Sequence, residues 1–409
     1  MNSINAWRNI FGKRDRLPDS LVIIKEQMGQ EGTGKNLEGQ STEKQTPKAY
    51  LKGINGLRSI FVIPVILLHL IMHFDEYGLD PQLFGESIVE RRLGMAVYGL
   101  GVFFGISGFL ITYLLRLEMR KRGVISIKRF YWRRALRILP LYYAQIFVSL
   151  ILYKIFNIEY TNWDLLVYYG TYMVNIPYVF GGVLPLLGHY WSLAVEEQFY
   201  LFWPWVNKLS NRQLLRMCWV FLILLLTLRS ALMYIQPDAI FLLIVDHPWF
   251  QCMVVGALFA LYYLNYKETM LKYIGTIYCQ TASWIFLLGS LVLYRGFVPF
   301  DIELTTAASC LILIGQNTKK VYFNIETPFL NYAGRISYSV YIVHMSVIFL
   351  CGELIPWELI ESVFLRYTLS IMTVFGFVIL VAHIFHKLIE MPFMKLKERR
   401  FTYVHGMRA

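Results

Sequence analysis

The chain has 409 residues, of which 56% are hydrophobic and only 16% are charged. An average soluble protein carries about 25% charged residues, and no water-soluble fold could bury this much apolar surface without wide exposed patches. The composition therefore predicts a polytopic membrane protein and excludes disordered, collagen-like and disulfide-scaffold classes. The net charge of +12 is no sign of nucleic-acid binding here, because in a membrane protein the placement of basic residues matters more than their sum.

Three regions follow from composition along the chain. Residues 1–50 are polar and contain no long apolar run, so we expect a flexible cytoplasmic N-terminal arm. A transmembrane domain is predicted over 51–395, followed by a short cytoplasmic tail over 396–409. The five cysteines lie in or beside apolar runs and form no CxxC pair, so neither a disulfide framework nor a metal site is expected.

Apolar stretches that can cross a bilayer of roughly 30 Å recur from Leu57 to the end of the domain. The predicted fold class is an all-α polytopic transmembrane helix bundle. We place ten spans near residues 57–74, 95–115, 138–156, 190–207, 215–234, 249–264, 278–294, 303–316, 335–351 and 367–386. A further apolar stretch, 164–188, contains two prolines and adjacent glycines, and we expect a re-entrant or broken helix there.

Basic residues set the predicted orientation. The segment 116–137 holds nine of them against the single acid Glu118, so we interpret it as a cytoplasmic loop. With ten spans, both termini are then cytoplasmic, and the remaining acidic loops fall on the outer side.

A histidine lies inside the first predicted span. His69 follows Arg58 by eleven residues, which places it about 16 Å deeper along a helix, near mid-bilayer. Ionisable groups at that depth cost several kcal/mol unless they are paired or line a wet cavity, so each is a functional candidate. A general base and a hydrogen-bonded core histidine both stay open for His69. We interpret a second intramembrane histidine, His344, as structural.

Two adjacent carboxylates, Glu196 and Glu197, lie in another apolar span. On a helix they point about 100° apart, so they serve different partners. One could orient His69, as the acidic member of a catalytic triad does, and the other could pair with a basic residue. A purely structural salt bridge is the alternative. Trp191 and Ser192 add polar groups to the same segment.

Arginines cluster just before the third predicted span. Arg134 and Arg137 are three residues apart and therefore share one helix face at the cytoplasmic membrane surface. Two guanidinium groups there make a site for the phosphates of a lipid head group or a nucleotide-type ligand. Simple positive-inside anchoring is the alternative. In the second predicted span, the spacing of Gly99, Gly101, Gly105 and Gly108 favours close helix packing.

Taken together, these motifs resemble the acyltransferase-3 family of integral membrane acyltransferases. The resemblance rests on Gly56-Leu57-Arg58 with His69, on the runs 101–112, 133–140 and 191–200, on 334–339 with His344, and on 389–393. The motifs follow one another in the same order as in that family, and they extend over nearly the whole membrane domain.

The resemblance implies transfer of an acyl group, usually acetyl, from cytoplasmic acyl-CoA to a hydroxyl of a cell-surface or exported glycan, at a bacterial inner (plasma) membrane. The expected partners are acetyl-CoA as donor, a glycan acceptor and membrane lipid, with no metal and no nucleic acid. The predicted catalytic residues are His69, Arg58, Glu196 and Glu197; the acyl-CoA site has Arg134, Arg137 and Arg133; the substrate site has Trp191, Ser192 and Tyr200.

Other function classes stay open. A proton-coupled transporter or flippase of a glycan or lipid intermediate would use His69, Glu196 and Glu197 as a proton relay; internal repeats would favour it, and the two halves show no convincing similarity. A non-catalytic subunit that binds a glycan enzyme is a further alternative. The sequence separates neither direct transfer from an acyl-histidine route nor one acceptor glycan from another.

Overall fold

The computed structural model describes residues 50–80, 86–159, 163–235, 249–292 and 300–401. The predicted N-terminal arm, apart from Tyr50, and the end of the predicted tail lie outside the described residues, so the proposed domain boundaries stay predictions.

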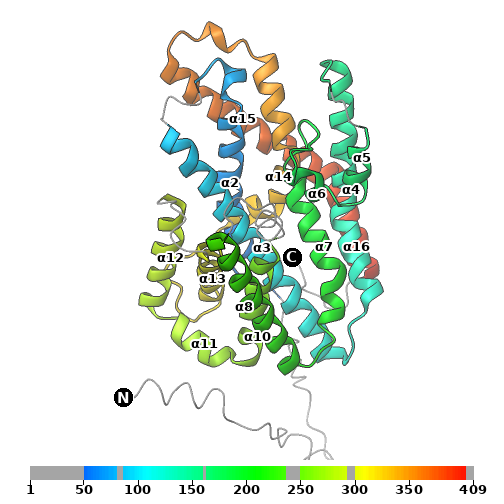
Figure 1. The fold of residues 1–409 in the computed structure, drawn as a ribbon, viewed down its shortest axis with the longest axis vertical. Helices are drawn as coiled ribbons and strands as arrows, with labels where there is room; N and C mark the ends of the chain where they lie inside the picture. The colour runs from blue at the N-terminus through cyan, green and yellow to red at the C-terminus, as the bar shows by residue number, and fades with distance from the viewer. Residues whose placement is uncertain (1–49, 81–85, 160–162, 236–248, 293–299, 402–409) are drawn as a thin grey trace, which may run out of the picture. The chain divides into compact units, whose positions relative to one another are not determined.

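Every element in the described part of the chain is a helix, which confirms the all-α bundle (Figure 1). The longer helices are α2 (Ile54–Met72), α3 (Glu86–Arg122), α4 (Ile127–Ile155), α7 (Tyr190–Val206), α8 (Asn211–Ile235), α10 (Phe250–Asn265), α12 (Ile277–Val292), α13 (Asp301–Gly315), α14 (Pro328–Leu354) and α15 (Val363–Phe385). The shorter ones are η2 (Phe74–Tyr77), α5 (Leu165–Gly170), α6 (Asn175–Val179), α11 (Lys267–Ile274), η3 (Trp357–Leu359), η4 (His386–Glu390) and α16 (Met391–Phe401).

Each predicted span has a helix at its position, although the helices differ in length. In the described ranges, 6 helices are long and apolar enough to cross a membrane, or up to 7 if the bent pair α11 and α12 is one span. By contrast, α7, α10 and α13 have 17, 16 and 15 residues. The chain is therefore an integral membrane protein, and the number of ten crossings stays a prediction.

Of two segments predicted to interrupt the spans, one differs from the prediction and one agrees with it. The basic segment 116–137 is not a loop, because α3 continues to Arg122 and α4 begins at Ile127. Lysine and arginine favour helix, and the break falls at Gly123, whose φ of 70° suits glycine. The stretch 164–188 is a broken helix as predicted, since it contains only the short helices α5 and α6 between turns.

Helix α3 lies at the centre of the bundle and packs most extensively against α10. Small residues make this approach possible, as the glycine spacing predicted. A Cβ atom on Gly108 would lie 1.9 Å from the carbonyl oxygen of Met253, and one on Gly256 would lie 2.0 Å from that of Gly105. The two backbones are therefore in direct contact.

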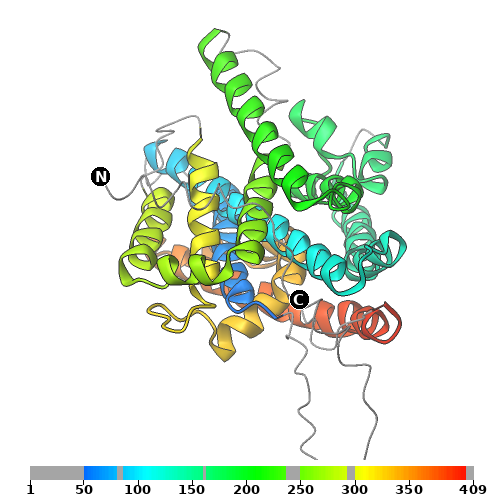
Figure 2. The same cartoon turned by 90° about the horizontal axis from the view of Figure 1, so that it is seen from below.

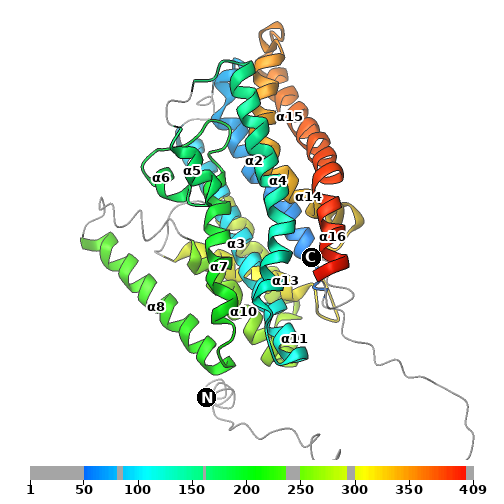
Figure 3. The ribbon, with the colours of Figure 1, turned by 90° about the vertical axis from the view of Figure 1, so that its right-hand side faces the viewer.

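Apolar side chains cover the outer surface of the helices at the edge of the bundle. Helix α8 stands at that edge in Figures 2 and 3, and its exposed apolar residues are Trp219, Val220, Ile223, Leu224 and Leu228. On α15 the exposed apolar residues are Met372, Phe377, Ile379 and Leu380. Such surfaces fit a lipid environment, where apolar exposure has no cost.

Packing among five helices brings distant parts of the chain together. Helix α2 packs against α14 and α3, and α16 packs against α4. Figure 3 shows α16 beside the first half of α4. Between α15 and α16 the helix widens into the π-helix η4, a feature that often marks functional sites.

His73, the residue after α2, makes the stability of the fold depend on pH. His73 and Glu76 form an ion pair with 2.6 Å between Nδ1 and Oε1, and this hydrogen bond raises the pKa of His73 above its ordinary value. The pair therefore stabilises the fold at low pH, and its contribution is lost as pH rises through the raised pKa. With both side chains about a quarter to a third exposed, we expect less than about 1 kcal/mol. We expect thermal unfolding in detergent, measured from about pH 5 to about pH 9 so that the range includes the ordinary histidine pKa, to show this loss in the native chain and not in Glu76→Gln.

Candidate functional site

Five helices meet around a small buried cavity of about 90 Å³, which we call the arginine cavity. Its polar lining residues are Arg58 of α2, Ser107 of α3, Arg134 and Arg137 of α4, Ser192, Glu196 and Glu197 of α7, and Ser337, Tyr338 and Tyr341 of α14. The structure thus brings three of the four predicted arginines together with the predicted carboxylates. Their sequence separation shows that folding, not local sequence, creates this cavity.

Arg134 and Arg58 have different neighbours in the cavity. Arg134 lies over the ring of Tyr200, with 4.8 Å from its guanidinium carbon to the ring centre. Arg58 has Glu196 and Arg134 as electrostatic neighbours. Within the described ranges, neither Arg58 nor Arg134 has a hydrogen-bond acceptor on the protein. Two such cations on one cavity favour the binding of an anion.

The two carboxylates of α7 have different surroundings, as their angular separation predicted. Glu196 accepts hydrogen bonds from Ser107 and Tyr200. Glu197 also lines the cavity, and its buried Oε1 atom has no hydrogen-bond partner among the residues described. Glu196 therefore connects α7 to α3, while Glu197 has an unused acceptor.

Three histidines form a cluster in the bundle: His69 of α2, His344 of α14 and His189 in the turn just before α7. The rings of His69 and His344 are 4.9 Å apart between centres, and those of His189 and His344 are 4.7 Å apart. The His69 Nδ1 atom lies 2.8 Å from the carbonyl oxygen of Val65 and 3.2 Å from Nε2 of His344. The expectation that a carboxylate orients His69 is wrong in this structure, because His344 occupies that position.

His189 is unusual within the cluster. Its side chain is buried, and neither imidazole nitrogen has a well-formed hydrogen bond within the described part of the chain, although the backbone of Ile342 is nearby. An unpaired buried polar group costs about 1–3 kcal/mol. Groups left unpaired in a free protein are often those that contact a ligand.

Tyr341 lies between the arginine cavity and the histidine cluster. Its ring lines the cavity and contacts the rings of His189 and His344, with centres 5.2 and 5.5 Å apart. Its hydroxyl lies 2.6 Å from the Ser192 hydroxyl and donates to the His189 carbonyl oxygen at 2.9 Å. His69 is not part of the cavity lining. Tyr341 therefore connects the cavity lining to two of the three histidine rings.

Three predicted site residues occupy other places. Arg133 points away from the cavity and pairs with Glu118 at 3.0 Å. The Trp191 ring packs among the rings of Phe104, Tyr178 and Trp249. Tyr200 is buried under Arg134, so it supports the cavity from behind and is not part of its lining.

A second and larger cavity of about 270 Å³ lies beside the first. Its polar lining residues are Asn55, Arg137, Arg335, His386, Glu390, Lys395 and Glu398. Arg137 lines both cavities and so connects them. Positive side chains dominate the second lining, with two carboxylates among them.

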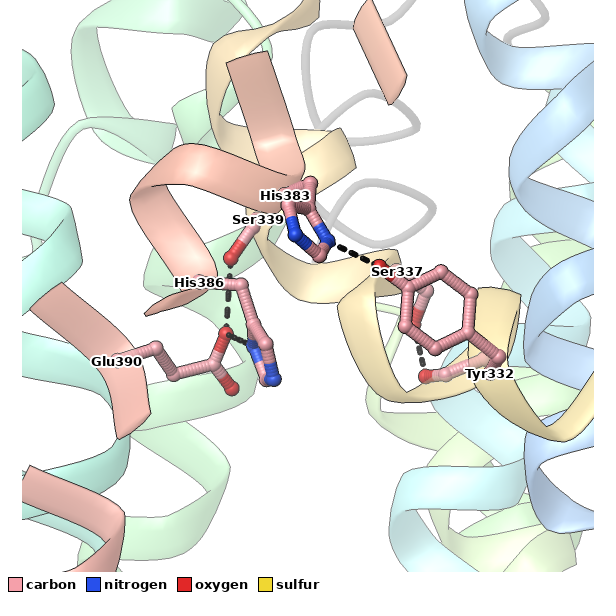
Figure 4. A network of polar contacts seen from close by, with 7 residues as sticks. Tyr332, Ser337, Ser339, His383, His386 and Glu390 are labelled. Carbon is pink, nitrogen blue, oxygen red and sulfur yellow. Dashed lines mark hydrogen bonds and ion pairs between the residues drawn. The ribbon is translucent and has the colours of Figure 1, made fainter. Parts of the chain in front are cut away.

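The π-helix η4 shapes one wall of the second cavity. Figure 4 shows Ser339 and His386 both directed at Glu390, each 2.8 Å from its Oε2 atom. On the opposite side Tyr332 contacts His383 (Figure 4). The extra residue of the π turn lets Glu390 face inward, where it is also an electrostatic neighbour of Arg137.

Sequence reasoning missed several members of this region. His189 and Tyr341 lie in segments that were examined for other residues, and His344 was interpreted as structural. The sequence did contain a sign of the cluster, because His189 and His344 both stand in apolar surroundings, where histidine is unusual. In the described ranges, no group of three or more histidine, cysteine or acidic side chains could hold a metal ion.

The helical bundle, its polar cavities and its histidine cluster define a polytopic membrane protein with polar groups in its interior. Residues 51–384 match the acyltransferase domain of the acyltransferase-3 family, and the chain belongs to this family.

The curated relatives carry more specific names. The chain is 30% identical over 172 residues to a peptidoglycan O-acetyltransferase, OatA, of Listeria monocytogenes, a match covering 38% of this chain and 24% of that protein. It is 28% identical over 216 residues to the O-acetyltransferase OatA of Staphylococcus aureus, covering 48% of this chain and 32% of that protein. The chain thus matches a quarter to a third of the length of these relatives. No solved structure matches the chain.

Proposed function

We propose that this chain is a membrane O-acetyltransferase that moves an acetyl group from cytoplasmic acetyl-CoA to a hydroxyl of a cell-surface or exported glycan. The family and the printed names of the two relatives support transfer of an acetyl group, and one of these names specifies peptidoglycan. The basic segment 116–137 and the positive-inside rule support cytoplasmic termini at a bacterial plasma membrane. The two cavities then lie toward the cytoplasmic end of the bundle.

One observation carries the proposal: Arg58 and Arg134, without acceptors within the part described, line a cavity that lies one side-chain layer from a histidine cluster. Arginine suits phosphate groups because its donors form a planar fork. The donor's phosphates would bind along the second cavity and at Arg137. The long pantetheine arm would continue through the arginine cavity and displace Tyr341 to reach His69.

The chemistry requires a base at the thioester. In direct transfer, the His69 Nε2 atom takes the proton of the acceptor hydroxyl, the hydroxyl oxygen bonds to the thioester carbon, and the carbon–sulfur bond breaks. The departing thiolate then takes the proton from His69, so the enzyme returns to its starting state. In the acyl-histidine route, Nε2 itself bonds to the thioester carbon and the carbon–sulfur bond breaks, which releases the thiolate. The hydroxyl oxygen then bonds to the acyl carbon, the carbon–nitrogen bond breaks, the hydroxyl proton goes to the thiolate, and His69 is neutral again. Both routes need His69 neutral at the start.

The remaining polar groups support these steps. Glu196 balances the charge of Arg58 and is held by Ser107 and Tyr200. Glu197 and Ser192 also line the cavity. We assign Glu197 a catalytic role and Ser192 a role in binding the substrate. A hydrogen-bond donor near the thioester oxygen would stabilise its developing charge, which is a large effect in a site that excludes water.

The direct test uses the purified full chain in lipid vesicles. Acetyl-CoA and soluble peptidoglycan fragments are added, and the release of free CoA thiol and of alkali-labile acetate on the glycan is measured. We expect both products in equal amounts. CoA-independent movement of a glycan-lipid across the vesicle, without acetate on it, would instead favour a flippase and contradict the proposal.

Arg137→Ala should chiefly weaken the use of acetyl-CoA. Loss of a hydrogen bond to a charged group costs about 1.5–3 kcal/mol, so we expect the KM for acetyl-CoA to rise roughly 10- to 100-fold with a smaller change in kcat. The matched control is Arg133→Gln on the same helix, whose partner is Glu118 and not the cavity. An unchanged KM in Arg137→Ala would exclude a phosphate-binding role.

A further inference from the structure

His344 contacts His69 across the bundle, although 275 residues separate them in the chain. Its ring is completely buried, on the face of α14 that packs against α2. The Nε2 atom of His344 is 3.2 Å from Nδ1 of His69. At the other side of its ring, Nδ1 of His344 lies 2.6 Å from the carbonyl oxygen of Tyr341. Both nitrogens of His344 are thus engaged.

The hydrogen-bond acceptors in this chain of contacts determine which ring nitrogen of each histidine carries a proton. A carbonyl oxygen can only accept a hydrogen bond, so Nδ1 of His344, which faces the Tyr341 carbonyl, carries a proton. By the same argument, Nδ1 of His69 carries a proton because it faces the Val65 carbonyl. In a neutral ring the other nitrogen then has a lone pair. Nε2 of His344 therefore accepts from Nδ1 of His69.

This assignment has a consequence for reactivity. The Nδ1–H group of His69 is shared between the Val65 carbonyl and His344, which leaves its Nε2 atom with the free lone pair that a general base needs. When Nε2 takes a proton, His69 becomes positively charged. A neutral acceptor on Nδ1–H stabilises that charge, as the orienting group of a catalytic triad does.

We propose that His344 is a positioning residue for His69, which fixes its tautomer and stabilises its protonated form during acyl transfer. This inference rests on the proposed function. No carboxylate hydrogen-bonds His69, His189 or His344 in the described part of the chain, so a second imidazole performs the role. The other titratable groups facing the pair are His189, which packs on both rings, His73 from the end of α2, and Tyr341.

The expected effect is moderate, because the Val65 carbonyl keeps part of the orientation when His344 is absent. A hydrogen bond to a group that becomes charged contributes about 1.5–3 kcal/mol, which corresponds to roughly a 10- to 100-fold change in rate. Binding of acetyl-CoA should not change, because His344 does not line either cavity.

The test compares His344→Phe with His344→Gln in the vesicle assay. Phenylalanine fills the buried space without an acceptor, whereas the glutamine side-chain oxygen can accept from His69 near the position of Nε2. We expect His344→Phe to lower kcat roughly 10- to 100-fold at an unchanged KM, and His344→Gln to recover most of the loss. Full activity in His344→Phe, or equal loss in two folded variants, would overturn the inference.

A second measurement does not depend on activity. Nitrogen NMR of protein with ¹⁵N-labelled histidine reports the tautomer of each ring, and the His69→Ala variant identifies the His69 signals. We expect a protonated Nδ1 in His69 whose signal shifts in His344→Phe. If the native chain transfers no acetyl group but shows this coupling, the proposed function fails and the histidine pairing stands. If the chain is active and the His69 signals do not respond, the positioning role fails.

Discussion

Replacing His69 by alanine is expected to abolish acetyl transfer and to leave the protein folded and inserted in the membrane. In the proposed function, the imidazole either takes the hydroxyl proton or carries the acyl group, and a positioned general base contributes about 10²- to 10⁴-fold to a rate. The side chain is partly buried and hydrogen-bonded at Nδ1 to its own helix and to His344. Its removal leaves the α2 backbone unchanged, so the loss should appear in kcat.

The control for this experiment is His73→Ala, a change of the same kind one turn later that lies outside the cluster. Both variants are compared for yield in the membrane, elution as a single species in detergent and turnover of acetyl-CoA. We expect normal yield for both and loss of turnover for His69→Ala alone. A His69→Ala protein with native turnover would remove the catalytic role and favour the non-catalytic subunit.

Much of the arginine cavity could be predicted from sequence, because charges in an apolar segment are visible without coordinates. Arg58, Arg134 and Glu196 each stand out as costly groups beside or within predicted spans. Costly groups must pair or share a wet cavity, and these three do share one. Arg133 shows the limit of this reasoning, because one residue of displacement turns its side chain by about 100° toward Glu118.

The histidine cluster could not be predicted in the same way. The pairing of His69 with His344 depends on which faces of α2 and α14 meet, and a single sequence contains no information on that register. A nearby carboxylate, Glu196, was the more familiar partner for a histidine. Its oxygen is instead used by Ser107 and Tyr200.

The position of Tyr341 was equally hidden, and it changes the expected mechanism. In the proposed function the donor has to reach from the arginines to His69, and the Tyr341 ring lies between the arginine cavity and the rings of His189 and His344. Its hydroxyl joins Ser192 to the His189 backbone, so the closed arrangement has its own hydrogen bonds. A donor must replace those bonds when it enters.

Helices α3 and α10 pack with their backbones in direct contact. Gly108→Ala should prevent correct packing, because the new Cβ atom would lie 1.9 Å from the Met253 carbonyl oxygen. That oxygen belongs to the backbone, so relief requires the two helices to separate. Overpacked positions usually cost about 1–3 kcal/mol and sometimes more. We expect a clear fall in Tm in detergent and in membrane yield.

Gly99→Ala on the same helix is the matched control, since its Cβ atom would be 3.6 Å from the nearest atom, an ordinary contact. Alanine favours helix over glycine by about 1 kcal/mol, so the control should keep or slightly raise the Tm, and the two variants should move in opposite directions. Activity should follow packing, because α3 also carries Ser107, which donates to Glu196. A displaced α3 removes that hydrogen bond and opens the arginine cavity, whereas a Gly108→Ala protein with native Tm and turnover would show that the helices do not approach this closely.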